Sequence, residues 1–100
     1  MTVKEALEKA LKLIKRGWTK DDFAKNKNNR SCSPFSSKAV KWCAAGAITR
    51  VCDNNYALRH AVQNCLTDLL NLQIHYWNDH ATKKDVIAGF QKAIESVSNA

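Results

Sequence analysis

The chain has 100 residues and a formal net charge of +7, with 45% hydrophobic and 25% charged residues. These values are typical of one globular domain over residues 1–100 and exclude a disordered or low-complexity chain. The longest apolar run, residues 42–48, is shorter than the roughly 20 residues of a transmembrane helix, so we expect no membrane association. Because Met1 leads directly into a charged helical pattern, we expect no secretory signal and a cytoplasmic location.

The first predicted helix covers residues 3–16. Thr2 and Glu5 form a T-x-x-E capping box, and apolar residues recur every three or four positions after it. Gly17 is a natural left-handed stop for this helix. Thr19 is then a candidate cap for a short helix over about residues 20–25. The Asn-, Lys- and Ser-rich stretch that follows, up to Ser36, is the one long loop.

The third predicted helix begins near Ser36 or Ser37 and runs to about residue 51. Its apolar stripe, widened by Trp42 and the small residues 44–47, indicates the central buried helix. Gly46 inside a helix costs up to about 1 kcal/mol relative to Ala, so we expect another helix to pack closely at this point.

Two further helices complete the prediction. One follows the turn at residues 53–55 and ends within residues 71–76, and the last begins after Thr82, which forms a start signal with Asp85. No segment shows the alternating pattern of a half-buried strand. The sequence therefore predicts an all-α fold, a compact bundle of four main helices plus one short helix.

Three motifs stand in order along the chain: G-W at residues 17–18, W-C-A-A-G-A-I at residues 42–48 and W-N-D at residues 77–79. Together they resemble a family of small uncharacterised all-helical proteins from bacteria, phages and prophages, over about residues 7–97. The resemblance implies a shared fold and a mobile-element setting, and it implies no catalytic activity. The Lys- and Asn-rich loop at residues 25–30 departs from the commoner pattern of that family.

The three tryptophans, Trp18, Trp42 and Trp77, have two interpretations. They are either anchors of the core or a platform on which bases or a nucleotide stack. Stacking requires an exposed ring beside a cation, and Trp18, between Arg16 and Lys20, fits that requirement best.

The polar pair Asn78 and Asp79 also has two interpretations. We expect it to cap backbone groups between two helices. The alternative is a binding site that includes His75 or His80, or a small enzyme in which Asp79 orients a histidine base. The histidines are five residues apart and not the four typical of helical metal ligands, so we expect no metal site.

The four cysteines match no zinc framework and contain no C-x-x-C pair. Cys43 and Cys65 fall on apolar helical faces, and we expect buried thiols there. Cys32 lies in the basic loop, where Arg30 favours a reactive thiolate, but no base is identifiable beside it, so we expect an inert thiol.

The positive charge is confined to one half of the chain. Residues 1–50 carry 12 Lys and Arg against 4 Asp and Glu, whereas residues 51–100 carry 4 against 5. This pattern predicts an anion-binding patch. Its candidate residues are Lys12, Lys15, Arg16, Lys20, Lys25, Lys27, Arg30, Lys38 and Lys41.

We therefore expect a small binding protein without enzymatic activity or cofactor, whose basic half engages nucleic acid or an acidic host protein surface. The resemblance and the small size favour an inhibitor of a host nucleic-acid or defence machine, similar in kind to an anti-CRISPR protein. The alternative is a protein that sequesters a nucleotide signal in a pocket lined by tryptophans and basic side chains. Monomer and homodimer both stay open.

Overall fold

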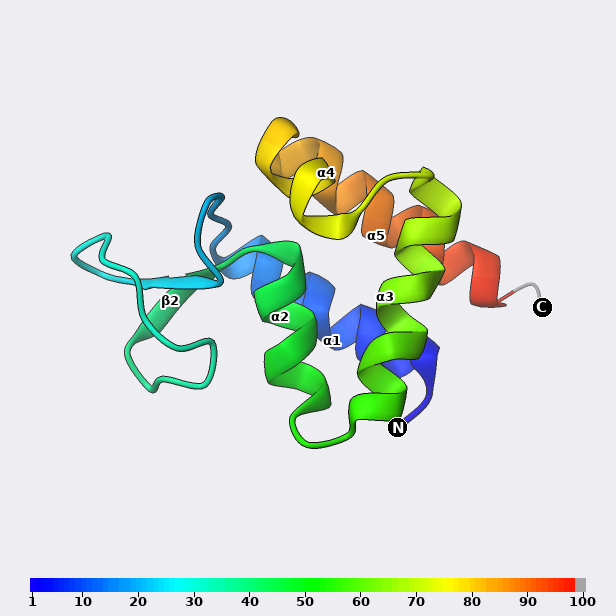
Figure 1. The fold of residues 1–100 in the computed structure, drawn as a ribbon, viewed down its shortest axis with the longest axis horizontal. Coiled ribbons are helices and arrows are strands. Elements are labelled where there is room, and N and C mark those ends of the chain that lie inside the picture. Colours follow the sequence, from blue (N-terminus) through cyan, green and yellow to red (C-terminus); the bar gives the residue numbers. More distant parts are fainter. Residues whose placement is uncertain (99–100) are drawn as a thin grey trace.

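The structure is a computed structural model, and it describes residues 1–98. Within that range, five helices pack together, and a two-stranded antiparallel sheet projects from them (Figure 1). In chain order the elements are α1 (Val3–Arg16), β1 (Ala24–Asn26), β2 (Ala39–Trp42), α2 (Ala44–Cys52), α3 (Tyr56–Leu70), α4 (Ile74–His80) and α5 (Lys83–Ser98).

Helix α1 begins as the sequence predicts. The N–H of Glu5 donates to Oγ1 of Thr2 (3.1 Å), and the N–H of Thr2 donates to Oε1 of Glu5 (3.0 Å), which completes the capping box. The helix ends at Gly17, whose N–H donates to the carbonyl of Leu13 (3.0 Å). Gly17 is extended (φ −172°), so the predicted left-handed stop is wrong.

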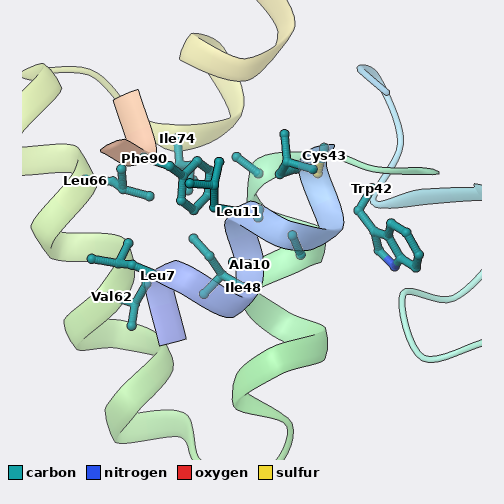
Figure 2. Close-up of a cluster of buried hydrophobic side chains, with 14 of the residues drawn as sticks. Leu7, Ala10, Leu11, Trp42, Cys43, Ile48, Val62, Leu66, Ile74 and Phe90 are labelled. Carbon is teal, nitrogen blue, oxygen red and sulfur yellow. The ribbon is translucent and has the colours of Figure 1, made fainter. Parts of the chain in front are cut away.

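The core lies between α1 and the helices around it. α1 packs against α2, α3 and α5, and its buried face includes Leu7 and Leu11. Figure 2 shows these side chains among Ile48 of α2, Leu66 of α3 and Phe90 of α5. Among residues 1–98, no helix has both the length and the apolar character needed to cross a membrane.

The short helix predicted over residues 20–25 is absent. Asp21 has a φ of 72°, which is incompatible with a right-handed helix, and β1 begins three residues later at Ala24. The N–H of Cys43 donates to the carbonyl of Phe23 (3.2 Å). Hydrogen bonds to distant segments thus hold this stretch in a non-helical conformation, and they outweigh its local helix signals.

The third predicted helix begins at Ala44 and not near residues 36–37, because β2 precedes it. Cys43 is the residue that caps α2, since its Sγ accepts a hydrogen bond from the N–H of Gly46 (3.2 Å). The all-α prediction is therefore wrong. The fold is mostly helical, but it includes the antiparallel pair β1–β2.

The second half of the chain contains one helix more than predicted. α3 ends at Leu70, where Asn71 adopts a left-handed conformation (φ 54°), and the separate helix α4 then begins at Ile74. The start of α5 is confirmed, because Thr82 and Asp85 exchange hydrogen bonds of 3.2 and 3.4 Å.

Residues 24–42, which we call the basic arm, project from the helical body (Figure 1). The molecule measures 41 Å along its longest axis, and the arm extends along that axis. Within the arm, Lys25 lies opposite Lys41 and Asn26 lies opposite Ala39, so Val40 is an extra residue that bulges from β2.

Gly46 of α2 lies against the backbone of the segment just before the basic arm. A Cβ at this position would overlap the carbonyl oxygen of Phe23, so the close neighbour is the backbone before β1 and not the helix that we expected. Gly→Ala in a helix normally stabilises by about 1 kcal/mol. We expect Gly46→Ala to lower the free energy of unfolding instead, by about 1–3 kcal/mol, in urea denaturation. An exposed control, Ala88→Gly on α5, measures the difference in helix propensity between Ala and Gly without a steric contact. A gain in stability for Gly46→Ala would contradict the close approach.

Candidate functional site

The amide of Asn78 joins three segments that are distant in the sequence. Asn78 lies on α4, and only 1% of it is exposed. Its Oδ1 accepts hydrogen bonds from the indole N–H of Trp18 (2.8 Å) and the N–H of Ala44 (2.9 Å). Its Nδ2 donates to the carbonyl of Thr19 (3.1 Å) and to Oδ1 of Asp79 (3.2 Å). Every donor and acceptor site of this amide is therefore occupied.

The G-W and W-C segments also bind each other directly. The N–H of Trp42 donates to the carbonyl of Gly17 (3.0 Å), and the N–H of Thr19 donates to the carbonyl of Trp42 (3.2 Å). Gly17 has no room for a side chain, because a Cβ there would overlap the carbonyl oxygen of Val40. The three sequence motifs thus meet at one place, the connection between the helical body and the basic arm.

The two neighbours of Asn78 in the W-N-D motif are also structural: Asp79 binds a backbone N–H, and Trp77 packs in the core. Oδ1 of Asp79 accepts a hydrogen bond from the N–H of Asp21 (3.0 Å) and so fixes the left-handed turn there. Trp77 is 8% exposed and packs against Phe90, and its ring leaves no space for a side chain at Gly89. These contacts favour the capping interpretation of Asn78 and Asp79 over a binding site.

A small pocket of about 80 Å³ lies beside this junction. Its lining residues are Asp21, Asp22, Phe23, Cys43, His75 and Asp79. The His75 ring packs edge-on against Phe23 (centroids 5.3 Å apart), and Nδ1 of His80 lies 2.8 Å from the carbonyl oxygen of Tyr76. Within residues 1–98, no hydrogen bond joins Asp79 to a histidine, and no three His, Cys, Asp or Glu side chains are placed to share a metal ion.

Cys43 faces this pocket as a protonated thiol. Burial raises the pKa of Cys43 above its ordinary value, and the N–H groups of Gly46 and Ala45 offset only part of that effect. Cys43 is buried as predicted, whereas Cys65 is only partly buried against the core. Cys32 is also partly buried against the core. The Sγ of Cys43 accepts a hydrogen bond from the N–H of Gly46, so the side chain of Cys43 caps α2.

The tryptophans are placed as anchors. Trp42 is 2% exposed, its indole N–H donates to the carbonyl of Pro34 (3.1 Å), and the guanidinium groups of Arg16 and Arg50 lie 6.0 and 5.3 Å from its ring centroid. Trp18 is partly buried and is bound to Asn78 through its indole N–H. Of three pockets formed by residues 1–98, none has a tryptophan in its lining.

The predicted basic residues separate into two groups. The first group lies on α1 and the segment after it: Lys12, Lys15, Arg16 and Lys20. The second group lies on the basic arm: Lys25, Lys27, Arg30, Lys38 and Lys41. The arm contains no Asp or Glu, and the one ion pair found within residues 1–98 joins Lys25 to Asp22 (3.7 Å). The arm thus places five cations in a segment that contains no carboxylate of its own, and Asp22 outside the arm pairs with one of them.

Sequence reasoning missed Arg50, which holds the arm in place. Its Nη1 donates to the carbonyls of Pro34 (2.8 Å) and Ser36 (3.2 Å). These two bonds tie the loop before β2 to α2, and the Trp42 indole ties the same loop to the end of β2. No local signal identifies this role, because Arg50 looks like an ordinary cation in the last turn of a helix.

Removal of the Asn78 amide should destabilise the fold. Asn78→Ala leaves the Trp18 indole, the Ala44 N–H and the Thr19 carbonyl without partners, at about 1–3 kcal/mol for each buried group. We expect the free energy of unfolding to fall by about 3 kcal/mol in urea denaturation, against less than about 0.5 kcal/mol for the exposed control Asn64→Ala. Equal stability of the two variants would show that the amide is not structural.

The raised pKa of Cys43 predicts a loss of stability in alkali. The unfolded chain ionises its thiol at about pH 8.5, before the folded protein does, so the free energy of unfolding falls as pH rises from there. We expect Cys43→Ser, which keeps an oxygen to accept from Gly46, to show a smaller decrease between about pH 8 and pH 10 in urea denaturation. Identical pH dependence in both proteins would refute the burial effect.

Comparison with known proteins identifies a family. A family model described as "Family of unknown function (DUF6197)" matches residues 1–96, a range that includes Trp18, Ala44 and Asn78. No curated protein and no solved structure matches the chain. The match does not address a phage or prophage setting, which stays a prediction. The chain therefore belongs to DUF6197, a family of unknown function.

Proposed function

We propose that this protein binds an anionic target through its basic arm and acts by binding, without catalysis. The observation that carries the proposal is the charge of the arm. Residues 24–42 contain five Lys and Arg and no Asp or Glu, and they project from the helical body (Figure 1).

The arrangement of the lysines supports the same proposal. Lys25 and Lys41 are directly opposite each other in the antiparallel pair, which places two like charges on one face of the sheet. Such pairs destabilise a sheet. Asp22 pairs only with Lys25. An anion bound near Lys41 would therefore reduce the repulsion between Lys25 and Lys41.

Nucleic acid is the target class to test first, because exposed lysines and an arginine without partner carboxylates are typical of phosphate-backbone contacts. We extend the proposal to a cytoplasmic setting in a bacterial host and to interference with a host nucleic-acid or defence machine. This extension is supported by the resemblance of the three sequence motifs to those of proteins from phages and prophages.

Neutralising the exposed charges of the arm should weaken binding and reduce its dependence on salt. The test variant changes four residues to Gln: Lys27, Arg30, Lys38 and Lys41. Each phosphate contact contributes about −0.7 to the slope of log K against log salt for a single strand, so the slope should become shallower by about 3. Fluorescence anisotropy with labelled single-stranded DNA, RNA and duplex DNA measures this slope.

A matched control removes the same charge from the helical body. It changes four exposed lysines of α1 and α5 to Gln: Lys4, Lys9, Lys84 and Lys92. We expect this control to keep most of the binding and the slope of the unaltered protein. Equal losses in both variants would show that net charge, and not the arm, determines binding. Binding that does not change with salt would refute the electrostatic proposal.

A further inference from the structure

The basic arm contains a hollow of about 400 Å³. Two segments line it, the turn after β1 and the segment that enters β2. The lining residues are Asn26, Lys27, Asn28, Ser37, Lys38 and Val40. Binding pockets for small molecules are commonly about 300–1,000 Å³, so the hollow has room for a ligand larger than a single carboxylate or phosphate.

The first wall is held by the side chain of Asn26. Its Oδ1 accepts hydrogen bonds from the N–H groups of Asn28 (2.9 Å) and Arg30 (3.1 Å). The N–H of Asn29, which is left-handed (φ 63°), donates to the Asn26 carbonyl (2.9 Å). This closed turn fixes the backbone that carries Lys27.

The second wall is held from the helical body. Oγ of Ser36 accepts a hydrogen bond from the N–H of Lys38 (3.1 Å), and the carbonyl of Ser36 accepts one from Arg50. The N–H of Ala39 donates to the same carbonyl (3.1 Å). The lysine of this wall therefore also extends from an ordered backbone.

The lining combines charge with an apolar surface. Lys27 comes from one wall and Lys38 from the other, and no ion pair with a carboxylate engages either of them within residues 1–98. The bulge at Val40 adds an apolar side chain that is 42% exposed.

These features match one nucleotide better than an acidic peptide. A peptide carboxylate needs a cation and little volume. A nucleotide presents a phosphate to paired ammonium groups and a flat base to apolar or aromatic side chains. The hollow offers two lysine side chains and the apolar side chain of Val40.

We propose that this hollow binds one nucleotide unit of a single-stranded nucleic acid, with its phosphate between the ammonium groups of Lys27 and Lys38. The proposal rests on the proposed function, because it assigns a ligand class and a place to the binding by the arm. The Val40 side chain then contacts the sugar and base.

A steric block tests this site without a change in charge. Ser37 is exposed and its hydroxyl takes part in no hydrogen bond found within residues 1–98, so Ser37→Trp should fold normally and fill the hollow. We expect about a 10-fold or larger loss of affinity for labelled oligothymidine in fluorescence anisotropy. Ser96→Trp on α5, which adds the same ring at an exposed position away from the arm, should change affinity less than about 2-fold. Circular dichroism melting curves of both variants check their folding.

Competition distinguishes a strand from a free nucleotide. Thymidine monophosphate should displace the oligonucleotide weakly and should shift the amide resonances of residues 26–28 and 37–40 in the unaltered protein, but not in Ser37→Trp. Unchanged oligothymidine affinity in Ser37→Trp would overturn the hollow as the site. If binding then still depended on the four arm cations, the proposed function would stand. If the unaltered protein bound no polyanion, both proposals would fail.

Discussion

The hydrogen-bonded amide of Asn78 is the constraint on which the rest of the structure depends. An unpaired amide inside a protein is costly, and Asn78 is buried on a seven-residue helix that has little stability of its own. Three of its four hydrogen bonds form only if α4, the first residue of α2 and the Trp18–Thr19 segment lie together. One side chain thus selects a single arrangement of three segments.

The position of the basic arm follows from this junction. The Thr19 segment leads into β1, and β2 leads through Cys43 into α2, so both ends of the arm start from fixed points. Arg50 then fastens the loop before β2. Because the arm is held at its base, its cations form a defined surface. With five Lys and Arg and no Asp or Glu, this projecting element carries most of the net charge of +7.

Local signals predicted the elements that depend on local interactions. The capping box at Thr2 and the start signal at Thr82 place α1 and α5 correctly. The strands and the start of α2 depend on partners far along the chain, so the helix signals around residues 20–25 and 36–43 were misleading. α4 was missed because seven residues give too little periodicity to detect.

The candidate site was predictable to a similar degree. The motif residues were found from the sequence, but only burial and hydrogen bonding show that Trp42 and Asn78 are structural. The cations of the arm were all identified, whereas their separation from those of α1 required the structure. Asn26 was not singled out and Ser37 was predicted only as the start of a helix, since a polar loop gives no sign of which residues share a hollow.

Native-state hydrogen exchange at the Ala44 amide tests the central claim most directly. This N–H belongs to the first turn of α2, where a helix supplies no partner of its own, and its bond is to Asn78. If the amide of Asn78 holds the junction, the Ala44 N–H should exchange only through global unfolding, with the same free energy as the central amides of α1. Fast exchange at Ala44, by local opening while α1 stays protected, would contradict the account.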